Sequence, residues 1–481
     1  MKQTGLLILL FLLCAVGGMA QKGNIVITGQ VVNRQADTPR SLNINVNDSF
    51  SADARINVPL DDDGRFRANL DFPFGHDFSI DYDGIFMLYA SPGDSLHITI
   101  DAGRLNKDVD AITFSGRGDE RCIACNRFSK EMSDVIYWRP DSLQRYDLPL
   151  DEYMQCFNRA YHSICDTVAR YAKAKGFSEQ TRKFLCTDVL FALSNDCLGY
   201  QGRTPQESVA FFRQPVFRLN DPDNLSNYLM YSIHLGMYHF KLCEQDSVLA
   251  RLMKAKDSEA IERRQMEIIL EQLKSISRDV MLSHYFEQQR RVPVPDSTAF
   301  TLPVIWQRLE EMSRELQQRD TAYVHFSCGS DSIIRHDAGG EAAAYTAICT
   351  DDFFRYLSKR HPGKVLYIDI FSTWCGPCRE DRKVMPELHA QFSEKDVVFV
   401  NLCLKSKRKA WAEMLEGGEL KGENYWFNEE LSNRLMSAIS LHGFPTYMLL
   451  GSDGRFLTRN ASRPIEHEKT VRAIQRALGI K

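Results

Sequence analysis

The sequence has little imbalance of charge and, beyond its first twenty residues, no long apolar run. Its 59 Lys and Arg residues face 63 Asp and Glu residues, which gives a formal net charge of −4. Binding to nucleic acid or to an anionic membrane surface normally requires clustered basic charge, so neither is expected. A membrane-spanning helix needs about 20 apolar residues, and no segment of the mature chain supplies them.

Cysteine is too thinly spread to build a disulfide scaffold, since 13 cysteines are scattered over 481 residues rather than concentrated in a short chain. Internal repeats and low-complexity tracts are absent as well. The hydrophobic content of 44% is enough to bury several cores. At roughly 150 residues per domain, the length suggests about three domains.

The first twenty residues have the features of a secretory signal peptide. Lys2 supplies the charged start, residues 6–13 supply an apolar stretch too short to span a bilayer, and Gly18-Met19-Ala20 supplies a small-residue cleavage site. We therefore expect cleavage after Ala20 and a soluble, exported protein.

Cys14 lies inside this signal. Leu13 precedes it, where a lipoprotein signal has a small residue, so we expect no lipid anchor. Cleavage leaves 12 cysteines in a compartment where disulfides persist. Their pairing cannot be deduced from the sequence.

Residues 21–115 predict a β-sandwich-like domain, because short alternating runs such as 25–28, 42–46 and 95–100 are separated by Gly, Pro and Asp turns. The segment Asp61-Asp62-Asp63-Gly64 offers oxygen ligands for calcium, but it lacks the further ligands of a calcium-binding hand. We interpret it as the Asp-Gly turn of a hairpin.

Residues 116–326 change to helical spacing, as in 152–174, 181–193 and 259–287, and predict an α-helical domain without a catalytic signature. Residues 327–344 are rich in Gly, Ser, Ala and Asp and lose this periodicity. They predict a linker.

Residues 345–481 predict an α/β domain. Continuous apolar strands are expected at 365–371 and 397–402, and a hairpin closed by an Asp-Gly turn is expected from 446–450 and 454–457. Helical stretches lie between and after them. This order indicates a parallel pair of strands followed by an antiparallel pair.

The sharpest signal in the chain follows directly after the first of these strands. Trp374-Cys375-Gly376-Pro377-Cys378 leads into the charged segment 379–381, which opens a helical stretch. If the helix starts at the first cysteine, its free N–H groups and dipole stabilise a thiolate on Cys375. The spacing brings Cys378 within reach, so it can resolve a mixed disulfide between Cys375 and a substrate.

Two other interpretations of this pair are half of a zinc site and a purely structural disulfide. Zinc requires four ligands, and no second close Cys/Cys or Cys/His pair lies in the same domain. A structural pair does not need a strand-to-helix turn. We therefore expect a redox-active Cys375–Cys378 disulfide, with no metal and no other cofactor.

Asp369 lies six residues before Cys375, in the middle of an otherwise apolar strand. An isolated carboxylate is costly to bury there. We hypothesise that it lies beneath the disulfide, has a raised pKa, and accepts a proton from Cys378 during resolution. The alternative is a partly exposed strand residue.

Pro445 stands in Gly443-Phe444-Pro445-Thr446, at the entry to a strand. Proline is tolerated there, and a cis peptide bond can redirect the backbone. Its position about seventy residues after the cysteine motif matches the loop that faces the cysteines in thioredoxin folds.

Residues 345–481 resemble the thioredoxin superfamily, and specifically its exported TlpA/ResA-like branch. The resemblance rests on YIDIFSTWCGPCRE, Trp411 and SLHGFPTYMLLGSDGRF. Less specifically, LDDDGRF, YASPGDSLHITI and ITFSGRG resemble the β-plus-helical extensions on such proteins of Bacteroides-type bacteria. The family offers no established role for residues 24–330.

The resemblance implies catalytic and substrate-binding roles for the matching positions. The catalytic set comprises the nucleophile Cys375, the resolving thiol Cys378, the buried acid Asp369 and the cis-proline Pro445. The substrate-binding set comprises Trp374, Gly376, Pro377 and Phe444. The substrate polypeptide is expected to pair as an added strand with the backbone around Phe444.

The chain departs from the family pattern at two places. Pro386 lies eight residues after Cys378, where relatives have a proline after about five, so a kink is expected one turn later. Cys403-Leu404-Lys405 stands where relatives often have an acid, and the basic segment 407–409 that follows is in a position to alter the choice of partner. Cys403 is either a third thiol at the site or a packed strand cysteine.

Cys122 and Cys125 form a second CxxC pair that opens a helical stretch. No buried strand precedes this pair and no proline loop follows it. We therefore favour packing or a structural disulfide over a second redox site.

The sequence as a whole predicts a multidomain periplasmic thiol:disulfide oxidoreductase. The Gly-Pro dipeptide favours a reductant of disulfides in exported proteins, as in cytochrome c maturation, and the family implies a membrane thiol carrier as electron donor. Two alternatives stay open: a disulfide oxidase or isomerase, and a cell-envelope scaffold protein whose thioredoxin domain is tuned by redox state.

Overall fold

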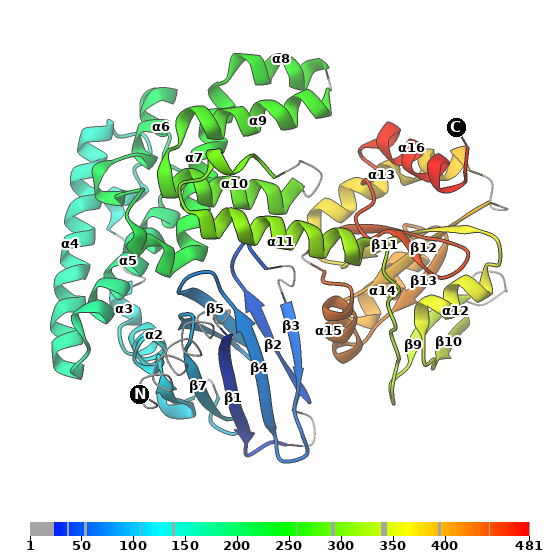
Figure 1. Ribbon diagram of the computed structural model, residues 1–481, viewed down its shortest axis with the longest axis horizontal. Coiled ribbons are helices and arrows are strands. Elements are labelled where there is room, and N and C mark those ends of the chain that lie inside the picture. Colours follow the sequence, from blue (N-terminus) through cyan, green and yellow to red (C-terminus); the bar gives the residue numbers. More distant parts are fainter. Residues whose placement is uncertain are drawn as a thin grey trace, which may run out of the picture. The chain divides into compact units, whose positions relative to one another are not determined.

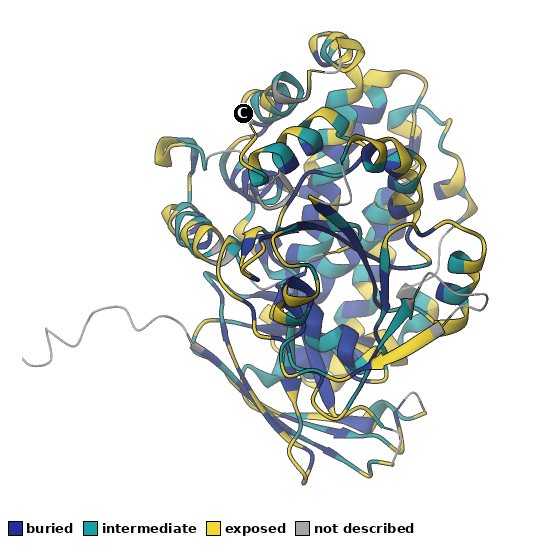
Figure 2. Ribbon diagram, turned by 90° about the vertical axis from the view of Figure 1, so that its right-hand side faces the viewer, coloured by how far each residue is buried: buried dark blue, intermediate teal, exposed yellow. Residues whose placement is uncertain are grey.

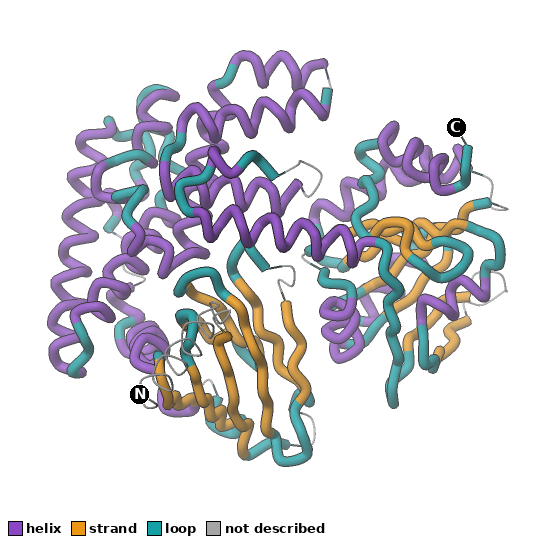
Figure 3. Tube along the Cα trace, in the orientation of Figure 1, coloured by secondary structure: helices purple, strands orange, loops and turns teal. Residues whose placement is uncertain are grey.

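The computed structural model describes residues 24–35, 38–51, 55–105, 107–136, 140–255, 257–289, 294–337, 344–392, 396–441 and 443–480. The expected signal peptide and its cleavage site after Ala20 lie outside these residues. The chain divides into two compact units, residues 1–51 with 58–310 and residues 52–57 with 311–481. Along the chain, strands give way to helices and then to an alternation of both (Figure 3).

The first unit begins with an all-β region of two four-stranded sheets, ordered β4-β1-β7-β8 and β3-β2-β5-β6. Its strands are β1 (Asn24–Val32), β2 (Ser41–Val46), β3 (Arg55–Pro59), β4 (Arg65–Asp71), β5 (His76–Asp81), β6 (Ile85–Ala90), β7 (Ser95–Asp101) and β8 (Ile112–Arg117). In β4, Phe66, Ala68 and Leu70 are buried and alternate with exposed residues, as expected of a sheet with one face against a core.

The acidic segment 61–64 forms a turn between strands of different sheets. Asp61 Oδ1 accepts the Arg65 N–H at 2.6 Å, and Gly64 takes the left-handed φ of 78° that glycine allows. The predicted turn is therefore present, but the predicted hairpin is wrong. β3 pairs with β2, whereas β4 pairs with β1.

A helical region follows the strands within the same unit (Figure 1). Its helices are α2 (Asp119–Glu131), α3 (Ser133–Ile136), α4 (Leu150–Lys175), α5 (Glu179–Asp196), α6 (Pro205–Phe212), α7 (Tyr228–Gln245), α8 (Ser247–Ala255), α9 (Ser258–Gln272), α10 (Ser275–Gln289) and α11 (Pro303–Asp320), the last of which crosses the boundary between the units. Ser178 caps α5 by accepting the Thr181 N–H at 3.2 Å.

The strands and helices of the first unit share a core, although the sequence predicts separate domains over 21–115 and 116–326. Tyr89 of β6 packs in one hydrophobic cluster with residues of α2, α4 and α5. The Cys122 thiol donates to the Tyr89 carbonyl at 3.1 Å, and Asp77 Oδ1 accepts the Leu229 N–H at 3.1 Å. These buried contacts unite the two regions in one compact unit.

The second unit is built on a seven-stranded sheet in the order β10-β9-β13-β12-β11-β14-β15. Its strands are β9 (Ile333–Asp337), β10 (Ala344–Ile348), β11 (Val365–Phe371), β12 (Val397–Cys403), β13 (Glu423–Trp426), β14 (Thr446–Leu450) and β15 (Phe456–Thr458). Its helices are α12 (Phe353–Arg360), α13 (Gly376–Gln391), α14 (Arg408–Glu416), α15 (Glu429–Ala438) and α16 (His467–Ala477).

The pairing at the centre of this sheet agrees with the prediction. β11 is parallel to β12 and antiparallel to β14, and β14 and β15 form the expected hairpin. All seven residues of β11 are buried, and Figure 2 draws buried residues in dark blue. Leu366, Ile368 and Ile370 face one hydrophobic cluster, while Val365 and Tyr367 face another that includes residues of α13 and α16.

The predicted linker at 327–344 is wrong. Ile333–Asp337 is β9, which pairs antiparallel with both β10 and β13. Cys328 and Ile333 are fully buried in the core of the second unit. The Gly, Ser and Asp content of this segment concealed a strand that pairs with the neighbouring β10 and with β13, which is distant in the sequence. Within the described residues, no helix is long and apolar enough to cross a membrane.

Candidate active site

The two cysteines predicted to be redox-active lie at the turn from β11 into α13. Cys375 is the N-cap of α13, and its sulfur accepts the Cys378 N–H at 3.2 Å. The two sulfurs form a disulfide with an S–S distance of 2.12 Å. Pro377 is in the first turn of the helix, where its missing N–H is tolerated. After reduction, the same N-terminal N–H groups can stabilise a thiolate on Cys375.

Asp369 is buried on the α13 side of the sheet, with 2% of its surface exposed. Successive strand residues face opposite sides, so it shares its side with Tyr367 and Phe371. Burial raises the pKa of its carboxyl to about 7, although the positive charge of Arg382 favours the ionised form. The alternative of a partly exposed strand residue is therefore wrong.

A cavity of about 380 Å³ gives Asp369 access to solvent, because its lining also includes exposed residues such as Lys383 and Lys421. Within the described part of the chain, Asp369 Oδ1 has no hydrogen-bond partner. The Arg382 guanidinium lines the same cavity and lies 4.1 Å above the Phe371 ring. A proton taken up by Asp369 can leave through this cavity.

Trp374 and Phe444 form an aromatic edge beside the disulfide. Trp374 is 62% exposed, and its ring centroid lies 5.7 Å from that of Phe444. Phe444 packs against the hydrophobic cluster that contains both cysteines, and the Phe444–Pro445 peptide bond is cis. The structure thus brings together segments separated by about seventy residues in the sequence.

The exposed residues Gly376 and Pro377 complete the predicted substrate-binding set at this surface. They lie between the two cysteines at the start of α13. Arg463 approaches them from outside the motif, with its Nη2 at 3.5 Å from the Pro377 carbonyl.

Two groups of supporting residues escape sequence reasoning. The carbonyl of Lys405 accepts the Trp374 Nε1–H at 2.9 Å, and Ser406 Oγ accepts the Thr373 N–H at 2.9 Å. Both residues follow β12, so β12 positions the loop that precedes Cys375. Nothing in the sequence marks this serine or this carbonyl.

The second group centres on Asp381, which is fully buried in α13. Arg463 Nε donates to Asp381 Oδ2 at 2.9 Å, and Tyr447 donates to the same oxygen at 3.1 Å. Asp381 is a charged residue between the buried positions Cys378 and Met385, and in this respect it resembles Asp369, which also interrupts a buried pattern. The hydrogen bonds of Asp381 connect the helix that carries the cysteines to β14 and to the segment before α16.

The remaining cysteine candidates are packed residues. Cys403 is fully buried in the cluster that contains the disulfide, and burial raises its pKa to about 12. Burial also raises the pKa of Cys122 to about 12 and that of Cys125 well above its usual value. Neither Cys122 nor Cys125 is disulfide-bonded. These thiols therefore lack the stabilised thiolate that exchange requires.

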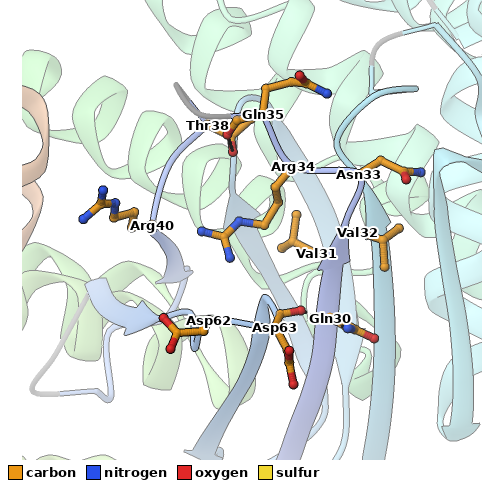
Figure 4. A pocket seen from close by; sticks show the side chains of 10 residues that line it. All are labelled: Gln30, Val31, Val32, Asn33, Arg34, Gln35, Thr38, Arg40, Asp62 and Asp63. Carbon is orange, nitrogen blue, oxygen red and sulfur yellow. Dashed lines mark hydrogen bonds between the residues drawn. The ribbon is translucent and has the colours of Figure 1, made fainter.

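An open pocket of about 560 Å³ lies at the end of β1 in the first unit. Figure 4 shows Arg34 pointing into it, with Asp62 and Asp63 along one edge. Arg34 Nη1 donates to the Asp61 carbonyl at 3.2 Å, and Gln30 donates to the Asp63 carbonyl at 2.9 Å. These polar groups bond to neighbouring backbone and offer no reactive group.

Comparison with known proteins assigns the domain around the disulfide. The thioredoxin-like family matches residues 363–456. These residues form a thioredoxin-like domain. Thioredoxin F of the rice chloroplast is 37% identical over 94 residues, which cover 18% of this chain and 48% of that protein. The thiol-disulfide oxidoreductase ResA of Bacillus cereus is 24% identical over 97 residues, covering 20% and 54%.

The chain thus spans about half the length of the curated relatives it matches. Among solved structures, a candidate thiol-disulfide oxidoreductase of Bacteroides vulgatus is 30% identical, with a TM-score of 0.25. The match covers 31% of this chain and 87% of that one.

Proposed function

We propose that this chain is an exported thiol:disulfide oxidoreductase that reduces disulfides in exported proteins. The observation that carries the proposal is the Cys375–Cys378 disulfide at the N-terminus of α13, in a thioredoxin-like domain with a buried acid on the adjoining strand. Relatives named as thioredoxins and thiol-disulfide oxidoreductases support the same chemistry.

In the reduced protein, the Cys375 thiolate attacks one sulfur of a substrate disulfide. This forms a mixed disulfide and releases the other substrate sulfur as a thiolate. Cys378 then attacks the Cys375 sulfur and its proton passes to Asp369. The substrate leaves with two thiols, and the protein is left with the Cys375–Cys378 disulfide. Two electrons have moved from the protein to the substrate.

The aromatic edge gives the substrate a place to bind. Trp374 offers an exposed apolar surface beside the cysteines, and the backbone at Phe444 and Pro445 lies at the entry to β14. A substrate polypeptide can pair there as an added strand.

We infer the direction of electron flow from the Gly-Pro dipeptide between the cysteines, which is that of thioredoxin and favours a reductant. A reductant working in the periplasm needs an external electron supply, and a membrane thiol carrier fills that role. The maturation of c-type cytochromes is one process that consumes such electrons. A disulfide oxidase would use the same residues in the other direction, and an isomerase would use them without a net transfer of electrons.

Substrate trapping tests the proposal. The Cys378→Ser variant cannot resolve the mixed disulfide, so exported proteins should accumulate covalently bound through Cys375 and be released by reductant. Cys403→Ser is the matched control, because Cys403 lies in the same cluster but is expected to take no part.

Several trapped exported proteins would support an oxidoreductase. A single partner that stays bound without a disulfide would instead indicate a scaffold protein. Equal trapping by Cys378→Ser and by a Cys375→Ser/Cys378→Ser double variant would contradict the proposed attack by Cys375.

A further inference from the structure

The cavity beside Asp369 contains an arginine whose hydrogen-bonding groups are buried without partners. Arg382 lies in α13, and its Nε, Nη1 and Nη2 atoms are all buried and have no hydrogen-bond partner among the described residues. Its guanidinium lies over the Phe371 ring, 4.1 Å from the ring centroid, which satisfies one face of the ion but none of its N–H groups. A buried cation is costly to leave in this state. An anion that accepts these hydrogens would remove the cost.

The two carboxyl groups in the cavity lining, Asp369 and Glu419, do not supply that anion. Asp369 Oδ1 itself has no hydrogen-bond partner in the described part of the chain. Burial raises the pKa of Asp369 to about 7, so the carboxyl is uncharged below that pH. Glu419 is exposed to solvent. Neither residue is hydrogen-bonded to the Arg382 guanidinium.

Basic side chains line the outer part of the same cavity. Arg379, Lys383 and Lys421 belong to its lining and are exposed. Lys383 also pairs with Glu380 on the surface, at 2.8 Å. Together with Arg382, these residues place four basic side chains around the cavity, against two carboxyl groups. Positive charge gathered at a cleft attracts small anions.

The rest of the lining suits a carbon skeleton. Met385 and Leu420 are buried and line the cavity together with Pro386. His389 stacks on the Phe399 ring at 3.8 Å between centroids, and its Nε2 is a further buried polar atom without a partner among the described residues. The cavity volume of about 380 Å³ is within the range of small-molecule sites.

We propose that this cavity binds a small organic dicarboxylate. One carboxylate accepts two hydrogen bonds from the planar guanidinium of Arg382. The carbon chain lies against Met385 and Leu420, and the second carboxylate faces Arg379 and Lys421 at the exposed end. Inorganic phosphate, which is charged on every side, would leave the apolar part of the lining without a matching surface.

A ligand at this place would affect Asp369 as well. The same cavity gives Asp369 its access to solvent, so a bound dicarboxylate closes the path by which the proton of Asp369 leaves. Succinate should therefore slow disulfide reduction by the wild type. This consequence rests on the proposed function, whereas binding itself does not. A Cys375→Ser/Cys378→Ser variant should bind succinate as tightly as the wild type does.

Calorimetric titration of the full chain with succinate at constant ionic strength tests the binding, with acetate and inorganic phosphate for comparison. We expect succinate to bind at least about 10-fold more tightly than either, because only succinate has two carboxylates joined by an apolar chain. Arg382→Gln should weaken succinate binding by at least about 10-fold. Equal affinity for succinate and phosphate, or no succinate binding at millimolar concentrations, would overturn the proposal.

Arg472→Gln is the matched control. It removes the same charge from α16, outside the cavity lining, and should leave succinate binding unchanged. An equal loss in Arg382→Gln and Arg472→Gln would reveal a general charge effect and contradict the site.

A second variant keeps the test decisive if Arg382→Gln does not fold. Arg379→Gln/Lys421→Gln changes only exposed residues. It should weaken succinate binding by about 3-fold and leave acetate binding unchanged, because acetate occupies only the Arg382 end. An unchanged ratio of the two affinities would show that no second carboxylate is bound there.

Discussion

Asp369 is the single residue that most clearly separates the proposed chemistry from a purely structural disulfide. A carboxyl on a fully buried strand destabilises the fold when ionised, and a packed apolar residue would avoid that cost. Its position on the α13 side and its place in the lining of a cavity that reaches exposed residues suit it to exchange protons with Cys378. The charge of Arg382 partly offsets the cost of ionisation.

Replacing Asp369 by Asn is expected to reduce the rate of disulfide reduction by roughly 10²-fold at pH 8, in the lower part of the range for general acid–base catalysis. The wild-type rate should rise through a pH of about 7, where Asp369 ionises, and the variant should lose that rise. A pH–rate profile of the reduction of a small protein disulfide measures both. Identical profiles would remove Asp369 from the mechanism.

The same substitution should change stability in a pH-dependent manner. Asp369 ionises near 3.8 in the unfolded chain and at about 7 in the folded one. Between these values the folded state retains a proton that the unfolded state has released, so a rise in pH destabilises the wild type. From pH 5 to pH 8, Asp369→Asn should gain roughly 3 kcal/mol relative to the wild type.

Urea unfolding of the oxidised proteins at the two pH values measures this gain. The reference is the difference in unfolding free energy between variant and wild type at pH 5, where both side chains are uncharged in the folded state. An unchanged difference at pH 8 would show that Asp369 is not a buried titrating group.

Sequence reasoning finds residues whose chemistry conflicts with their local pattern. Cys375 and Cys378 mark a strand-to-helix turn, and Asp369 interrupts an apolar run. Arg382 and Ser406 carry no such conflict, since an arginine on a charged helix and a serine in a loop are ordinary. Their roles come from neighbours that only the fold supplies.

At the scale of secondary structure, α13 is held at two points in its N-terminal half. Its start is fixed by the Cys375 cap and by the loop after β12. Its second turn is fixed by Asp381, which bonds to Arg463 and Tyr447. The position of the cysteines relative to β11 therefore depends on segments that are distant in the sequence.

Arg463→Ala should destabilise the second unit by about 3 kcal/mol, because it leaves a buried carboxylate with one hydrogen-bond donor in place of three. Denaturant unfolding followed at the second unit measures the loss. The double variant Asp381→Asn/Arg463→Ala should recover part of it, because the uncompensated charge is gone. A single variant as stable as the wild type would show that this contact does not hold α13.

Strand prediction succeeded for strands formed by apolar runs and failed for two short, polar strands inside the same sheet. β11, β12 and β14 are apolar runs whose burial on both faces produces a clear pattern. β9 and β13 are short and contain Arg, His, Glu and Asn. β9 and β13 pair with each other although they are about ninety residues apart in the sequence, and no local sequence pattern predicts this pairing.

At the scale of the whole molecule, the chain comprises two compact units. The first contains a buried ion pair, in which His76 Nε2 lies 3.1 Å from Asp48 Oδ2 with both side chains fully buried. The second contains the redox pair and the Asp381–Arg463 contact. The first-unit core, shared between strands and helices, could not be predicted because its contacts join segments that each look like complete domains.

Unfolding should therefore proceed in two transitions that respond to different substitutions. His76→Ala leaves a buried carboxylate unpaired and should lower only the transition of the first unit, by about 3 to 5 kcal/mol. Arg463→Ala should lower only the other transition. Calorimetry of both variants tests this, and a single shared transition that moves with either substitution would contradict it.

The central claim is that Cys375 and Cys378 form a reducing couple, and the reduction potential of that couple tests it most directly. The mature protein is equilibrated in graded thiol/disulfide buffers, and the state of these two cysteines is read by alkylation and peptide mass. We expect a potential near that of thioredoxin, about −270 mV. A value near about −120 mV would make the protein an oxidant, and the absence of any exchange at this pair would contradict an oxidoreductase altogether.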